Sequence, residues 1–192
     1  MKKLLAAALV AATPFFSPLV TAADYEFDKV HTQILFSVSH LGFSTSTGAF
    51  VEFDGGFSFD PDNIADASVN VVIQTDSVDM NDATWNEHLH DKKWFDVETH
   101  PTMTFTSSGV TPTGKKTMNI LGNLTIKGVT KPIVLNATLN KIGEAFGSER
   151  IGFDATATLD RSDFGVSNYL PAIPAEVQLR ITVEGLKIKD AK

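Results

Sequence analysis

Apolar and polar residues alternate along most of the chain between residues 25 and 186. An apolar residue at every second position is typical of a β-strand with one buried and one solvated face. The alternation predicts eight strands, most of them longer than the usual length of about 5–6 residues. They cover residues 25–38, 49–59, 67–78, 102–110, 115–127, 129–140, 150–160 and 176–186. Between the first two strands, the small, polar residues 40–48 predict a loop.

Two features interrupt this regular pattern. Leu35 breaks the alternation of the first strand, which indicates burial on both faces or a bulge. Gly55 and Gly56 stand in the middle of the second strand, where Val51 and Phe53 begin its apolar face. Glycine inside a strand favours a sharp bend or a close approach of another backbone, and we expect one of these here.

The apolar spacing changes from two to about three and a half between residues 81 and 101, which predicts one short helix near residues 82–93. Asp82 is placed to cap its start, because a carboxylate accepts hydrogen bonds from the free N–H groups of a first turn. A few helical turns alone are not stable in water. We therefore expect the helix to close one end of a barrel, with these residues facing inward: Trp85, Leu89, Trp94 and Phe95.

Long antiparallel strands joined by short turns predict an all-β barrel or sandwich. Eight strands is the number at which a closed barrel is filled by its own side chains or holds one small ligand. The 14 phenylalanines and two tryptophans suit a packed core as well as a ligand cavity, so composition leaves both open. An outer-membrane barrel fits poorly, because its lipid-facing positions would include Asn136, Gln178, Arg180 and Glu184.

The first 23 residues have the pattern of a secretory signal peptide, with Lys2 and Lys3 ahead of an apolar run and small residues at 21–23. This predicts export to the bacterial periplasm and a mature domain of residues 24–192, without a transmembrane segment. Removal of the two lysines takes the net charge from −7 to near −9. So acidic a chain argues against nucleic-acid binding and against electrostatic adhesion to anionic membranes. The absence of cysteine excludes disulfides.

No motif predicts catalytic residues. Residues 163–165 spell the kinase triplet DFG, but the chain lacks the accompanying phosphate loop and catalytic loop. His88, His90, Asp91 and His100 cluster in the helical stretch without the spacing of a zinc site, and a solvated helix face explains them better. There is no GxSxG elbow and no cysteine nucleophile. We predict neither a catalytic nor a metal site.

Several short motifs, each weak alone, are specific in their order and spacing. They are HLGF at 40–43, FDG at 53–55, HL at 88–89, WF at 94–95, FTS at 105–107, GNLTI at 122–126, GVTKP at 128–132, GF at 152–153 and RSDFG at 161–165. On these the mature chain resembles the YceI-like family of bacterial periplasmic proteins, also called polyisoprenoid-binding proteins. The resemblance implies an eight-stranded antiparallel lipocalin-like barrel around one long apolar lipid, such as a polyisoprenoid, a polyprenyl quinone or a fatty-acid amide.

The family implies a binding or transport protein that needs no cofactor beyond this lipid, with an isoprenoid quinone among the candidates. Strand parity places these residues on the interior wall: Phe36, Val38, Phe53, Met103, Phe105, Ile120, Leu135, Phe153 and Ile181. We expect His40, Phe43, Leu89, Trp94, Phe95 and Phe164 near the mouth, with His40 as a head-group contact. Alternatives are an enzyme acting on an exported lipid or small metabolite, and a barrel filled by its own side chains. A homodimer and a membrane redox partner stay open.

Overall fold

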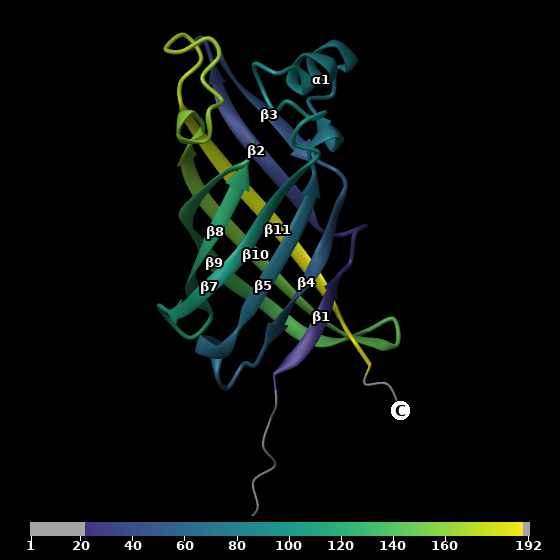
Figure 1. Cartoon of the computed structure of the whole chain (residues 1–192). Helices are drawn as coiled ribbons and strands as arrows, with labels where there is room; N and C mark the ends of the chain where they lie inside the picture. Colours follow the sequence, from purple (N-terminus) through teal and green to yellow (C-terminus); the bar gives the residue numbers. More distant parts are fainter. Residues whose placement is uncertain (1–21, 190–192) are drawn as a thin grey trace, which may run out of the picture.

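Residues 22–189, which the computed structural model describes, form antiparallel β-sheet with one α-helix and three short 3₁₀ turns (Figure 1). Of the signal peptide predicted for residues 1–23, residues 1–21 lie outside this range. The strands are β1 (Ala23–Phe27), β2 (Gln33–His40), β3 (Ser44–Phe50), β4 (Phe53–Phe59), β5 (Ser68–Gln74), β6 (Val78–Asp79), β7 (Thr102–Pro112), β8 (Thr117–Ile126), β9 (Val129–Ala145), β10 (Ser148–Asp160) and β11 (Glu176–Lys187). The helices are η1 (Ile64–Asp66), η2 (Thr75–Ser77), α1 (Ala83–His90) and η3 (Arg161–Phe164).

The strands close into an eight-stranded barrel, as predicted. Strands β4, β5, β7, β8, β9, β10 and β11 pair in this order, and β1 closes the ring by pairing with both β4 and β11. Beyond the end of β1, β11 pairs with β2 at residues 178–182. Consequently β1 and β2 occupy one strand position of the barrel, and the eleven strand segments fill only eight such positions.

Three of the predicted strands are broken, which corrects the boundaries of residues 25–38, 49–59 and 67–78. The breaks fall at residues 28–32, at 51–52 and at η2, and they lie at one level of the barrel. Val51 N–H donates to Ser77 O at 3.2 Å, and Gln74 N–H donates to Glu52 O at 2.9 Å. Beyond these breaks β2, β3 and β6, paired in that order, continue the barrel wall from β11 and lead into α1.

The loop predicted for residues 40–48 is wrong, because most of this segment is strand β3 in a hairpin with β2. Leu41 and Gly42 both take positive φ, of 54° and 77°, and make the tight turn between the two strands. The polar residues that indicated a loop pair across the hairpin, as Ser37 Oγ does with Thr47 Oγ1 at 3.0 Å. Val51 lies in the second break and its side chain is exposed. The prediction that it shares an apolar, inward face with Phe53 is therefore also wrong.

The predicted glycine pair in β4 does meet neighbouring backbone closely. A Cβ on Gly55, whose φ is +126°, would lie 2.1 Å from Asn70 O, and one on Gly56 would lie 2.4 Å from Tyr25 O. Backbone atoms cannot yield as a flexible side chain can, so only glycine fits here. This tight contact between β1, β4 and β5 lies at the end of the barrel that carries both termini.

The predicted helix is present, although it is shorter than residues 82–93. Asp82 caps it as expected, because its Oδ1 accepts a hydrogen bond from Trp85 N–H at 2.9 Å. The helix and the loop that follows η3, residues 165–175, lie at one end of the barrel, and the start of β1 and the end of β11 lie at the other (Figure 1). We call these the α1 end and the termini end. Among residues 22–189 no helix has the length and apolar character needed to cross a membrane.

Candidate functional site

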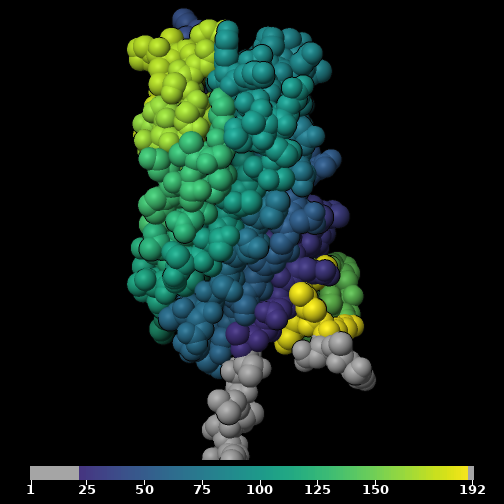
Figure 2. Space-filling model, in the orientation of Figure 1, coloured from purple at the N-terminus to yellow at the C-terminus, as the bar shows by residue number. Residues whose placement is uncertain are grey.

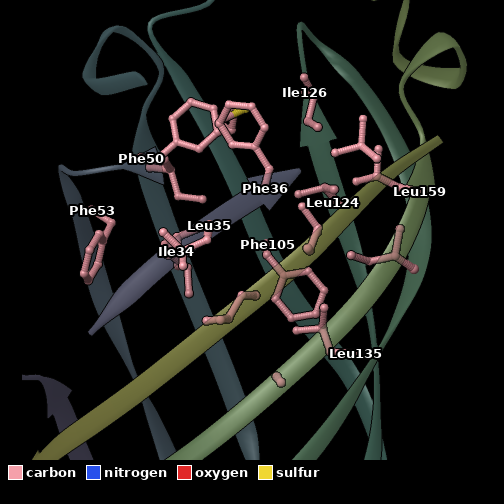
Figure 3. A pocket seen from close by; sticks show the side chains of 18 of the residues that line it. Ile34, Leu35, Phe36, Phe50, Phe53, Phe105, Leu124, Ile126, Leu135 and Leu159 are labelled. Atoms are coloured by element: carbon pink, nitrogen blue, oxygen red, sulfur yellow. The ribbon is translucent and has the colours of Figure 1, made fainter. Parts of the chain in front are cut away.

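A cavity of about 720 Å³ occupies the interior of the barrel. Every strand except β6 contributes side chains to its wall, and most of them are aliphatic or aromatic. Figure 3 shows Phe36 from β2, Phe105 from β7, Leu124 from β8 and Leu135 from β9 converging on this space. The volume lies within the range of about 300–1,000 Å³ typical of small-molecule sites.

The accessibility of the wall shows that the barrel is hollow. Phe36, Ile120 and Ile181 point inward but are only partly buried, because they border the cavity and not another side chain. A barrel filled by its own side chains would bury such residues completely, since protein cores pack like organic crystals. The alternative of a packed barrel therefore does not fit this structure.

Aromatic rings form the floor of the cavity toward the termini end. Phe57 and Phe59 both lie edge-on to Phe153, with ring centroids 5.8 and 5.2 Å apart. On its other side Phe57 stacks on Tyr25, which is buried and does not line the cavity. Phe57, Phe59 and Phe153 do line it. The rings therefore close the termini end with apolar surface.

The ionisable side chains of the wall belong to elements at the α1 end. They are His40 at the end of β2, His88 and Asp91 at α1, Lys93 just after it, and Arg161 of η3. Two aromatic contacts join the elements around this opening. Trp94 lies 6.1 Å from the ring of Tyr169 in the 165–175 loop, and Trp85 lies 6.0 Å from the ring of His40. The cavity wall is thus largely apolar, and its ionisable side chains lie at the mouth.

Arg161 is a buried cation in the wall at this mouth. Its guanidinium donates four hydrogen bonds to backbone carbonyls of the loop, at Val166, Asn168, Ile173 and Pro174, over 2.6–3.0 Å. Burial lowers the pKa of the guanidinium, although an arginine stays protonated in proteins. The guanidinium carbon of Arg161, Cζ, lies 5.6 Å from the ring centre of Trp94, which makes a cation–π contact. Arg161 therefore holds the 165–175 loop in place and leaves a positive charge beside the cavity.

All but one of the residues predicted for the site line the cavity. They are Phe36, Val38, His40, Phe53, Leu89, Trp94, Phe95, Met103, Phe105, Ile120, Leu135, Phe153, Phe164 and Ile181. Phe43 does not: it lies just after the β2–β3 turn and is 89% exposed. The sequence predicts Phe43 at the mouth because it predicts a loop for residues 40–48, whereas the hairpin carries this side chain beyond the mouth. Whether the other residues contact a ligand stays a prediction.

Two of the wall residues outside the predicted set show why the sequence pattern missed them. Leu35 lines the cavity together with its neighbours Ile34 and Phe36, although strand alternation would exclude it. The break in alternation noted at this residue was the only sign of it in the sequence. Arg161 was noted only as part of a motif, because its partners are backbone carbonyls, which carry no sequence signal.

A cluster of ionisable side chains lies away from the cavity, where the turn at residues 28–32 meets β10 and β11. Arg150 Nη1 lies 2.6 Å from Asp28 Oδ2 and 3.1 Å from Glu184 Oε2, and His31 Nδ1 lies 2.9 Å from Asp28 Oδ2. Burial raises the pKa of Asp28, but the hydrogen bonds from His31 and Arg150 outweigh it and lower that pKa to about 2. Among residues 22–189 Asp28, His31 and Glu184 are the one group spaced for a metal ion, and the guanidinium already occupies the place between the two carboxylates. The cluster braces the first strand break.

The sequence and fold match known proteins over nearly their whole length. The family model of the YceI-like domain matches residues 25–185. The UPF0312 protein of Azotobacter vinelandii is 41% identical over 192 residues, covering 97% of this chain and 99% of that protein. The UPF0312 protein of Pectobacterium carotovorum is 43% identical over 171 residues, covering 88% of each chain.

Solved structures show the same barrel. Burkholderia cenocepacia BcnA superposes with a TM-score of 0.76 at 28% identity, over 82% of this chain and 98% of that one. A polyisoprenoid binding domain from Saccharophagus degradans superposes with a TM-score of 0.65 at 17% identity, over 88% and 100%, and at that identity it supports the fold alone. The match to the family model over most of the chain decides the assignment: this chain belongs to the YceI-like family.

Proposed function

We propose that this protein is a carrier that holds the apolar tail of one long-chain lipid inside its barrel. The lipid is of the polyisoprenoid, polyprenyl quinone or fatty-acid amide type, and the carrier works in the periplasm. The observation that carries the proposal is the cavity of about 720 Å³ with its largely apolar wall. Export rests on the signal peptide pattern of residues 1–23 alone.

The size of the cavity supports a ligand on energetic grounds. Unfilled cavity volume costs on the order of 24 cal/mol per Å³ in protein cores. Water offsets little of this cost in an apolar space, because it needs two to four polar partners. An apolar chain gains about 25 cal/mol for each Å² of surface that it buries.

The distribution of polar groups supports one orientation of the lipid. The floor is mainly aromatic, and the ionisable wall residues belong to the α1 end. A polar head group buried at the floor would lose its hydration without a partner, which costs roughly 1–3 kcal/mol or more. The tail therefore points to the floor, and the head group lies at the mouth near His40 and Arg161.

The family supports a binding protein over an enzyme. A related fold carries the name of a polyisoprenoid binding domain, and the YceI-like match covers residues 25–185. Catalysis on the lipid would need titratable groups that converge on it. Ionisable groups do line the mouth, but none of the ion pairs found among residues 22–189 joins two of them.

Organic extraction and mass spectrometry of the protein, purified without refolding, test the proposal. We expect about one apolar chain per protein molecule. An exported protein without a cavity, prepared in parallel, controls for lipid carried over from the cells. Repeated preparations that contain no stoichiometric apolar compound would contradict the carrier function.

A further inference from the structure

Five exposed apolar side chains surround the mouth of the cavity. Leu41 and Phe43 lie at the turn of the β2–β3 hairpin, Trp85 lies on α1, and Tyr169 and Leu170 lie in the 165–175 loop. We call these five residues the rim. Figure 2 shows the helix segment and the 165–175 loop side by side at the α1 end, with the hairpin tip projecting above them. Trp85 and Tyr169 also line the cavity, so the rim continues the apolar wall to the outer surface.

The backbone holds the rim outward. The hairpin turn is closed by a hydrogen bond from Phe43 N–H to His40 O at 3.0 Å, and Leu41 and Gly42 take positive φ. In the loop, Ile173 N–H donates to Tyr169 O at 2.9 Å, and the buried Arg161 binds the carbonyls of Asn168 and Ile173. Ordered backbone therefore holds these side chains at the surface. Their apolar area stays in contact with water and is not buried by the fold.

The opposite end of the barrel offers a contrast. Phe146, in the turn between β9 and β10, is 95% exposed, but its ring covers the guanidinium of Arg150 at 5.4 Å and adjoins no opening. Apolar residues scattered singly on a surface are normal, whereas a cluster around an opening marks an interaction site. The rim is such a cluster.

The charge around the rim narrows the choice of partner. Residues 82–98, which contain α1, carry Asp82, Glu87, Asp91, Asp96 and Glu98 against only Lys92 and Lys93. An acidic surrounding repels anionic lipid head groups, which basic clusters attract. Trp, Tyr and Phe instead favour the boundary between head groups and acyl chains of any bilayer. The rim thus fits a bilayer surface that it enters by apolar insertion.

We propose that the rim docks the mouth of the barrel onto the surface of a lipid bilayer. This inference rests on the proposed carrier function, since a lipid that leaves the cavity at a docked mouth crosses no water. Phe43, the most exposed of the five, inserts first, and Trp85 and Tyr169 extend the apolar path inward to the cavity. Docking depends on apolar contact and not on anionic lipid.

Co-sedimentation with phosphatidylcholine vesicles tests the docking. We expect Phe43→Ser to lower the vesicle partition coefficient on the order of 10- to 100-fold, the loss that corresponds to one buried phenylalanine side chain. Phe43→Leu should keep most of the binding. Phe146→Ser is the matched control, with the same change at a similarly exposed residue of the opposite end, and it should bind as the unmodified protein does.

Three results would overturn the docking surface. The first is equal binding by Phe43→Ser and Phe146→Ser. The second is binding that occurs only when the vesicles contain phosphatidylglycerol and that disappears in 0.5 M salt. The third is no binding of the unmodified protein to vesicles with or without phosphatidylglycerol. The last result would indicate a protein partner for the rim. Because Phe43 does not line the cavity, lipid extracted from Phe43→Ser should be unchanged, so failure of the docking and failure of the carrier function are separate outcomes.

Discussion

Ile120 and Leu121 are neighbours on β8 that face opposite sides of the barrel wall, and they allow a matched test of the cavity. Ile120 lines the cavity and pairs with Val110 and Leu135, whereas Leu121 points outward and is 46% exposed. Leucine and isoleucine are isomers, so replacing each by glutamine makes nearly the same chemical change on the two faces. Only Ile120→Gln should weaken lipid binding.

The expected loss follows from the position of Ile120. The substitution removes part of an apolar contact that is worth about 1.5–3 kcal/mol when complete. It also sets an amide against an apolar tail, at a cost of roughly 1–3 kcal/mol. A combined loss of about 2–3 kcal/mol weakens the affinity on the order of 30- to 150-fold. For Leu121→Gln the change should stay within about twofold, as for most surface substitutions.

Displacement of a fluorescent polyene fatty acid from the delipidated protein measures both affinities. Circular dichroism and urea unfolding confirm that each variant is folded, and the affinity is compared only between folded proteins. Unchanged affinity in a folded Ile120→Gln variant would refute the placement of the tail against β8. An equal loss in both variants would refute it too, since the outward face would then matter as much as the inward one.

Three further predictions concern stability. Because the pKa of Asp28 is lowered to about 2 in the folded protein, its carboxylate stabilises the fold fully above its ordinary pKa of about 4. The difference in free energy of unfolding between the protein and Asp28→Asn should be constant above about pH 5 and shrink as the pH falls from about 4 to 2. Arg161→Met should cost about 3 kcal/mol in urea unfolding and speed hydrogen exchange in residues 165–175, because four carbonyls lose a charged donor. Saturation with lipid at 100–1,000 times its Kd should raise the Tm by roughly 5–16 °C in calorimetry, and organic extraction should reverse this.

The alternation of apolar residues was sufficient to predict the barrel and most of its inner wall. Ile120, Leu135 and Ile181 lie inward as parity requires, because a closed antiparallel sheet leaves each residue only two faces. The Asp82 cap and the close backbone approach at Gly55 were likewise predictable, since each depends on local chemistry.

The strand breaks, the β2–β3 hairpin and the cavity were not predictable from the same pattern. The strand breaks at residues 28–32 and 51–52 do not disturb the alternation enough to be seen, and they depend on hydrogen bonds between strands far apart in sequence. The hairpin that carries Phe43 outward contains Ser and Thr, which suit a loop as well as an exposed strand. The cavity itself depends on how far the strands stand apart, and the same residues could fill a narrower barrel.

The position of the lipid tail is the central claim, and photo-crosslinking with a long-chain lipid that carries a diazirine at the tail end tests it most directly. The probe is bound to the delipidated protein, irradiated, and mapped by mass spectrometry of peptides. We expect crosslinks to the floor, at Phe57, Phe59 or Phe153, and unlabelled lipid should compete with them. Crosslinks confined to the rim or to the outer face of the barrel would contradict it.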